Sequence, residues 1–253
     1  MISHRVDGPV EAPVVVLSNS LGTSHGMWDA QLPSLARHFR VLRYDTRGHG
    51  ASDVPPGPYD MAALGRDVLG LLDTAGIQRA SFCGLSLGGM TGMWLAAHAP
   101  ERVDRLVLCN TSSYMGAPEA WNTRIDAVRR GGMAAITEGV IERWFTSEFR
   151  AAEPAAVERI RQMLLTTSPE GYVACAAAVR DMDLRDDLTS ISAPTLVVSG
   201  TRDPATPPEH LRFIADRVRG ARLVELPTAH LSNIGAESAF TRTLMDFLFG
   251  SVT

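Results

Sequence analysis

Residues 80–89 read Ala-Ser-Phe-Cys-Gly-Leu-Ser-Leu-Gly-Gly, a short apolar run followed by the pattern Gly-x-Ser-x-Gly centred on Ser86. A helical stretch, Met90 to Ala99, comes next. A strand that turns sharply into a helix holds the residue at the turn at positive φ, and glycines two positions before and after it remove Cβ atoms that would collide there. The pattern therefore predicts a nucleophile elbow with the Ser86 hydroxyl exposed. The Leu87 amide could then point at an oxyanion, above the positive end of the helix.

Outward from the elbow, short apolar runs alternate with amphipathic helical stretches. The expected strands are Val14–Ser18, Val41–Asp45, Ala80–Cys83, Arg105–Cys109, Thr195–Ser199 and Arg222–Leu226. The expected helices between and after them include Leu64–Ala75, His210–Val218 and Glu237–Phe249. This alternation predicts an α/β fold in which helices cover both faces of a mostly parallel sheet.

The alternation breaks between about Met115 and Ile191, where helical stretches replace the strands. These stretches are Trp121–Arg130, Ala134–Trp144 and Ala155–Leu165. A helical insertion after the Arg105–Cys109 strand would lie over the carboxyl ends of the sheet strands, where open α/β sheets bind ligands. We therefore expect residues 1–114 and 192–253 to form the core and residues 115–191 to form a helical cap, or lid.

The composition narrows the class of protein. With 253 residues and 45% hydrophobic content, the chain can bury one large core. A net charge of −4 and scattered arginines provide no basic stripe, so no nucleic-acid partner is expected. Met1 to Asp7 lacks the apolar core of a signal peptide, and no segment approaches the roughly 20 apolar residues of a membrane span. The expectation is a cytoplasmic protein with no membrane partner.

Cysteine and lysine usage limit the chemistry further. Cys83, Cys109 and Cys175 are widely spaced and lack metal-ligand spacing, which predicts buried free thiols and no metal site. All 24 basic side chains are arginine, so a Schiff base, a Ser-Lys dyad and a phosphate-loop lysine are excluded. A charged group on a substrate should therefore meet arginine, although for most of these residues a compositional bias of the coding genome is sufficient explanation.

The elbow serine needs a general base, and the chain offers seven histidines. His230 follows the last expected strand, which places it on a loop at the same sheet edge as the elbow. His98 lies about 18 Å away along the helix after the elbow, at 1.5 Å per residue, and is expected to be structural. Ordinary surface or helix positions are expected for His4, His38 and His210. His25 and His49, in loops after strands, remain alternatives for the base.

The acid that orients the base should lie at a neighbouring strand end. Asp203 follows the Thr195–Ser199 strand, whereas the strand that ends at Cys109 is followed by Asn110 and no nearby carboxylate. A cap on the turn before Pro204 is the alternative role for Asp203. The order Ser86, Asp203, His230 is the order of a triad in this type of fold.

The second oxyanion donor is expected in the loop after Val14–Ser18, and by position we choose the Leu21 amide. In this loop the chain has Asn19-Ser20, whereas folds with a nucleophile elbow commonly have a His-Gly dipeptide. The glycine-rich segment Asp45–Ser52 does not lead into a helix with phosphate-loop spacing, so it predicts a packed structural loop.

Together these residues resemble the α/β-hydrolase family over essentially the whole chain. Within it, four segments are similar to the 3-oxoadipate enol-lactonases of the β-ketoadipate pathway: Asn19–Thr23 (NSLGT), Tyr44–Gly50 (YDTRGHG), Gly84–Gly89 (GLSLGG) and Glu142–Phe145 (ERWF). The first three recur in related esterases and perhydrolases, so the last one discriminates. The resemblance implies hydrolysis of 3-oxoadipate enol-lactone to 3-oxoadipate in the cytoplasm by Ser86, Asp203 and His230. Because His230 would activate both the serine and the water, we expect no metal or organic cofactor.

Such a lactone carries a carboxylate, which a mostly apolar pocket could hold only with a paired cation. Arg124 and Arg143, on expected cap helices, are the candidates, and Trp121 and Trp144 could line the same cavity. Solvated helix faces and core packing are the respective alternatives. Other functions left open are a general carboxylesterase or perhydrolase and a slow ligand-binding receptor. Dehalogenase chemistry would need aspartate at position 86.

Overall fold

A seven-stranded sheet forms the centre of the molecule in the computed structural model, which describes residues 1–250. The strands are β1 (His4–Asp7), β2 (Val14–Ser18), β3 (Arg40–Tyr44), β4 (Ala80–Leu85), β5 (Val103–Cys109), β6 (Thr195–Gly200) and β7 (Arg222–Leu226). Their spatial order is β1-β3-β2-β4-β5-β6-β7, and only β1 runs antiparallel to its neighbour. The mostly parallel sheet expected from the sequence is confirmed.

The central strands consist mainly of apolar residues and are buried on both faces, as a parallel sheet between helices requires. All six residues of β4 and of β6 are buried. By contrast, the edge strand β1 is mostly exposed and reads His-Arg-Val-Asp, so its sequence carries no apolar run. This explains why the sequence pattern did not reveal β1.

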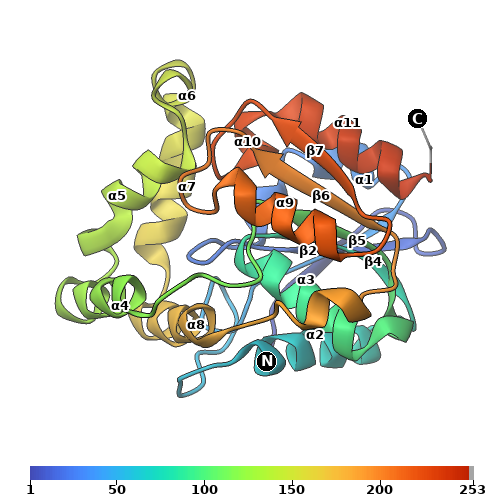
Figure 1. Cartoon of the computed structure of the whole chain (residues 1–253), viewed down its shortest axis with the longest axis horizontal. Coiled ribbons are helices and arrows are strands. Elements are labelled where there is room, and N and C mark those ends of the chain that lie inside the picture. Colours follow the sequence, from blue (N-terminus) through green and yellow to red (C-terminus); the bar gives the residue numbers. More distant parts are fainter. Residues whose placement is uncertain (251–253) are drawn as a thin grey trace.

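Helices cover both faces of the sheet, with α2, α3 and α9 on one side and α1 and α11 on the other (Figure 1). The α-helices outside the segment between β5 and β6 are α1 (Leu32–Leu35), α2 (Met61–Thr74), α3 (Leu87–His98), α9 (Pro208–Arg217), α10 (Ser232–Gly235) and α11 (Glu237–Leu248). Three short 3-10 helices are η1 (His25–Trp28), η2 (Pro100–Arg102) and η3 (Asp187–Ser190). The Asp60 carboxylate caps α2 by accepting the Ala63 N–H at 2.6 Å. Within residues 1–250, no helix has the length and apolar character to cross a membrane.

The chain between β5 and β6 is helical and lies to one side of the sheet, at the left of Figure 1. It contains α4 (Glu119–Gly131), α5 (Ala134–Trp144), α6 (Ser147–Ala152), α7 (Pro154–Thr166) and α8 (Pro169–Asp181). The three helices expected here correspond to α4, α5 and α7. Because α8 is alanine-rich and buried over most of its length, it lacks the apolar stripe that reveals a helix in sequence.

Candidate active site

Ser86 lies at a tight turn between β4 and α3. Its φ of 57° is one of two positive φ values found at non-glycine residues within residues 1–250. A Cβ on Gly84 would overlap the Gly88 carbonyl, and a Cβ on Gly88 would overlap Ser18. The Ser86 N–H donates to the Cys109 carbonyl at 2.9 Å, and the Thr111 hydroxyl donates to the Ser86 carbonyl at 2.7 Å. The turn therefore has the close packing that the Gly-x-Ser-x-Gly pattern predicted.

His230 and Asp203 form a buried pair on the loops after β7 and β6. The His230 Nδ1 lies 2.8 Å from Asp203 Oδ2, and the residues are only 2% and 3% exposed. Asn110 Nδ2 and the Thr206 hydroxyl donate to the same Oδ2 at 2.9 and 2.7 Å. Burial by itself raises the pKa of Asp203, but His230 and these donors outweigh it and keep the pKa below its ordinary value. Asp203 is thus arranged to stay ionised beside the ring.

Ser86 and His230 line the same cavity, which has a volume of about 170 Å³. Its wall also contains Leu21 together with all four residues predicted to contact substrate: Trp121, Arg124, Arg143 and Trp144. The Trp144 ring stacks on the His230 ring with 5.9 Å between centroids. Helices α4 and α5 therefore contribute directly to the surroundings of Ser86.

The backbone amides of Leu21 and Leu87 have no acceptor within residues 1–250. In residues 1–250, the Leu21 N–H has no hydrogen-bond partner, although Ser20, Gly22 and Thr23 on either side all have one. Leu87 is the first residue of α3, so its N–H has no acceptor four residues earlier in the helix. Leu21 follows Ser20 and Leu87 follows Ser86, and both serines line the cavity. These positions fit a pair of oxyanion donors.

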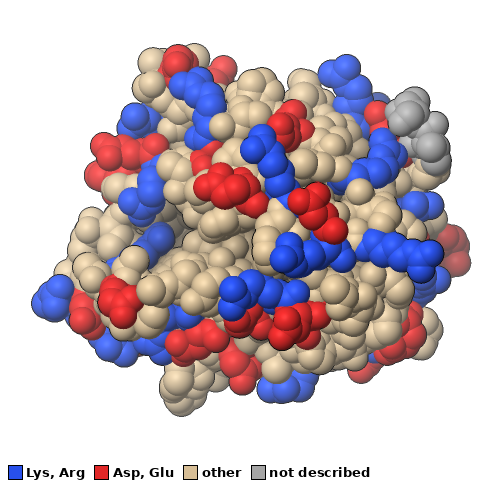
Figure 2. All heavy atoms as spheres, viewed as in Figure 1, with Lys and Arg blue, Asp and Glu red and all other residues tan. Residues whose placement is uncertain are grey.

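Arg124 and Arg143 are half-buried, and neither takes part in any ion pair formed within residues 1–250. The Arg124 guanidinium lies over the Trp121 ring at 5.1 Å, and its buried Nε has no partner. Burial, followed by the charge of Arg124, lowers the pKa of Arg143. Figure 2 shows a hollow at the left of the molecule with basic side chains inside it. An anionic ligand would relieve the repulsion between these two cations.

The other histidines considered as the general base, His25, His49 and His98, do not line the cavity. His49 accepts the Gly22 N–H, His25 pairs with Asp45 at 2.9 Å, and His98 stacks on Trp94. Cys83, Cys109 and Cys175 are free and buried, as expected. Among the described residues, no group of three His, Cys, Asp or Glu side chains is arranged to hold a metal ion.

Sequence reasoning missed the residues that hold Asp203. The strand pattern identifies Asn110 only as a strand-end position without a carboxylate, and it predicts no role for Thr206. Asn110 reaches Asp203 because β5 and β6 are neighbours in the sheet, whereas Thr206 lies three residues after Asp203 in the same loop. The signal for Asn110 is a polar residue directly after β5, and the signal for Thr206 is a hydroxyl residue three positions after Asp203, close enough to bind its carboxylate.

Comparison with known proteins agrees with this geometry. Residues 13–236 match the family model described as the alpha/beta hydrolase fold. 3-oxoadipate enol-lactonase 2 of Acinetobacter baylyi is 39% identical over 243 residues, covering 96% of this chain and 91% of the relative. The crystal structure of the enol-lactonase from Burkholderia xenovorans has a TM-score of 0.97 at 48% identity, covering 98% of this chain and 96% of that one. A thermophilic esterase from Thermogutta terrifontis has a TM-score of 0.93 at 31% identity, covering 100% of this chain and 94% of that one. The chain belongs to the α/β-hydrolase family.

Proposed function

We propose that this protein is a serine hydrolase that opens the lactone ring of 3-oxoadipate enol-lactone to give 3-oxoadipate. The observation that carries the proposal is one cavity in which Ser86 and His230 meet two arginines that form no ion pair within residues 1–250. The names of the relatives that are 39% and 36% identical, both 3-oxoadipate enol-lactonases, support the same substrate. As the resemblance to enzymes of the β-ketoadipate pathway implies, we assign the reaction to aromatic degradation in the cytoplasm.

The first half of the reaction forms an acyl-enzyme. His230 removes the Ser86 proton as the serine oxygen attacks the lactone carbonyl, and Asp203 stabilises the imidazolium that results. The Leu21 and Leu87 amides donate hydrogen bonds to the oxyanion of the tetrahedral intermediate. Collapse of this intermediate breaks the ring C–O bond and releases an enolate that stays tethered to the acyl group.

The second half releases the product. The His230 imidazolium gives up its proton, and protonation of the enolate carbon yields the ketone, so the ring cannot simply reclose and His230 is neutral again. His230 then takes a proton from water, whose oxygen attacks the ester to Ser86, and returns that proton to the serine as the bond breaks. The product leaves with two carboxylates. No step requires a metal or an organic cofactor.

Arg124 and Arg143 are proposed to bind the carboxylate that the lactone already carries. A carboxylate entering this cavity would lose hydration, and a paired guanidinium can replace that hydration with charge-assisted hydrogen bonds. Trp121 and Trp144 would pack against the ring of the substrate. Residues 115–191 would then act as a cap that selects substrates, and residues 1–114 and 192–253 as the core that performs the chemistry.

A general carboxylesterase is the second candidate, because an esterase is among the similar structures. Substitution of the arginines separates the two. For Arg124→Ala and Arg143→Ala, we expect KM for the enol-lactone to rise roughly 10- to 100-fold while turnover of the neutral ester p-nitrophenyl acetate changes little.

Two controls complete this experiment. Arg129→Ala removes an exposed arginine of α4 that pairs with Asp126 and does not line the cavity, so both activities should remain. Ser86→Ala should abolish both. Equal losses on lactone and neutral ester in the two cavity-arginine variants, or brisk ester hydrolysis by an enzyme that ignores the lactone, would favour the esterase.

A further inference from the structure

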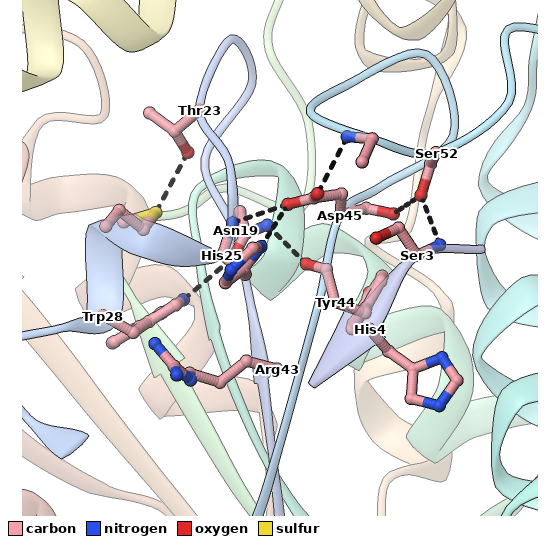
Figure 3. Close-up of polar contacts among 12 residues, drawn as sticks. Ser3, His4, Asn19, Thr23, His25, Trp28, Arg43, Tyr44, Asp45 and Ser52 are labelled. Atoms are coloured by element: carbon pink, nitrogen blue, oxygen red, sulfur yellow. Dashed lines mark hydrogen bonds and ion pairs between the residues drawn. The ribbon is translucent and has the colours of Figure 1, made fainter. Parts of the chain in front are cut away.

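The loop that carries Leu21 is held in place by the loop that follows β3. We name residues 19–23 the oxyanion loop and residues 45–52 the β3 loop. At the start of the oxyanion loop, Asn19 Nδ2 donates to the Tyr44 carbonyl at 2.6 Å. Just beyond its end, Asp45 Oδ1 accepts both the His25 N–H at 2.7 Å and the His25 ring at 2.9 Å (Figure 3). The two ends of residues 19–25 are therefore bound to two consecutive residues, Tyr44 and Asp45.

The middle of the oxyanion loop is held by His49. The His49 ring is 1% exposed, and its Nε2 accepts the Gly22 N–H at 2.8 Å. Its Nδ1 lies 3.2 Å from the Arg47 carbonyl. A carbonyl only accepts and an N–H only donates, so the ring must carry its proton on Nδ1 and present a lone pair at Nε2. Only neutral His49 in this tautomer can make both contacts.

The Gly22 contact bears directly on the Leu21 amide. Gly22 has a φ of +88°, which turns the chain immediately after Leu21. The Ser20 N–H points to Met27 Sδ at 3.3 Å, and the Thr23 N–H donates to the Ser20 carbonyl at 3.1 Å. With its neighbours fixed, the peptide between Ser20 and Leu21 has little freedom to rotate. An oxyanion donor is effective only if its direction is set before the reaction.

We propose that His49 is a positioning residue for the oxyanion hole, holding the Gly22 amide so that the Leu21 N–H stays directed into the cavity. This role rests on the proposed hydrolase function but not on the identity of the substrate. The contact is made only to protein, so it should leave substrate binding nearly unchanged and stabilise the transition state through Leu21.

Three substitutions at His49 test the proposal, because they differ in whether the new side chain offers an acceptor to the Gly22 N–H. His49→Phe keeps a flat ring but has no acceptor. His49→Gln places an amide oxygen near the position of Nε2, whereas the shorter side chain of His49→Asn ends near Nδ1 and cannot reach Gly22. We expect kcat to fall roughly 10- to 100-fold for the Phe and Asn variants, with KM within about threefold, and to recover largely for Gln.

The controls separate a specific role from general damage to the β3 loop. Ser52→Ala removes a hydroxyl that donates to the Asp45 carbonyl at 2.6 Å and faces Ser3 rather than the oxyanion loop. It should keep kcat. A boronic acid that mimics the tetrahedral intermediate should bind more weakly in proportion to the loss of kcat/KM across the His49 series. Circular dichroism and thermal unfolding report whether each variant folds.

All kinetics are measured with both the enol-lactone and p-nitrophenyl acetate. If the enzyme ignores the lactone, the proposed substrate is wrong but the ester still tests His49. Unchanged kcat in folded His49→Phe, or a loss just as large in Ser52→Ala, would overturn the positioning role. Should the Phe variant fail to fold, equal activities of the Gln and Asn variants would overturn it as well.

Discussion

The surroundings of Asp203 keep its carboxyl group ionised. Its carboxylate accepts hydrogen bonds from Asn110 and Thr206 and lies against His230, all of which favour the ionised form. In Asp203→Asn, the neutral amide could no longer stabilise the imidazolium or select its tautomer. We expect kcat to fall roughly 10³- to 10⁴-fold with little change in KM, as steady-state kinetics would measure. Asp181→Asn, at an exposed pair with Arg180, is the control, and a loss below about tenfold in Asp203→Asn would contradict the assigned role.

His49 should also make stability depend on pH. Burial lowers its pKa from 6.5 to about 4, against the opposing effects of the Arg47 carbonyl and Asp45. Cys175 Sγ lies 4.0 Å from its Nδ1. As the pH falls from 6.5 towards 4, the unfolded chain gains a proton that the folded protein excludes, so the free energy of unfolding falls by up to roughly 3 kcal/mol.

Urea unfolding between pH 7 and pH 5 measures this dependence. His49→Gln removes the titrating group, and its free energy of unfolding should therefore fall less steeply with acidification than that of the wild type. His98→Gln makes the same change at the exposed end of α3 and is the matched control. Equal slopes for the wild type and His49→Gln would show that His49 is not held neutral by burial.

At the scale of elements, α2 contains a matched pair of glycines. Gly65 is buried against α3, where an added Cβ would overlap the Trp94 ring, whereas Gly70 is exposed with nothing within 4 Å of an added Cβ. Gly70→Ala should stabilise the protein by about 0.5–1 kcal/mol, because alanine favours the helix and restricts the unfolded chain. Gly65→Ala should destabilise it by about 1–3 kcal/mol through overpacking. Urea titrations followed by circular dichroism compare the two, and the same sign for both would contradict the observed packing.

At the scale of the whole molecule, the site depends on contacts between the two ends of the chain. Asn233 is fully buried just after His230, and its Nδ2 donates to the Met27 carbonyl at 2.8 Å, while Gln31 donates to the Asn233 carbonyl at 2.7 Å. These bonds tie the His230 loop to the segment after the oxyanion loop.

Asn233→Ala should therefore lower both stability and kcat. A buried carbonyl of Met27 would lose its donor, which costs about 1–3 kcal/mol of unfolding free energy. Asn122→Ala, at an exposed residue that accepts from Arg180, should change stability by less than about 0.5 kcal/mol. Chemical unfolding and lactone kinetics on the two variants measure the contrast. If Asn233→Ala were as stable and as active as Asn122→Ala, the hydrogen bond from Asn233 to Met27 would contribute neither to stability nor to kcat.

The sequence by itself determined the elbow and the parallel sheet, because both depend on local patterns. Gly84 is needed because of its chain neighbours Gly88 and Gly89, and buried parallel strands such as β4 and β6 need runs of mainly apolar residues. The chain order of Ser86, Asp203 and His230 followed from which strand each residue comes after. The helices α4, α5 and α7 were visible for the same reason, since each has an apolar stripe.

Only the tertiary structure decided which residues support the candidate site. Asn110 binds Asp203 from the end of the neighbouring strand β5, and His49 reaches Gly22 from another loop. No periodicity encodes such contacts, because each depends on how separate segments fold against one another. The same holds for the meeting of Arg124 and Arg143 in one cavity, which required α4 and α5 to pack side by side above the elbow.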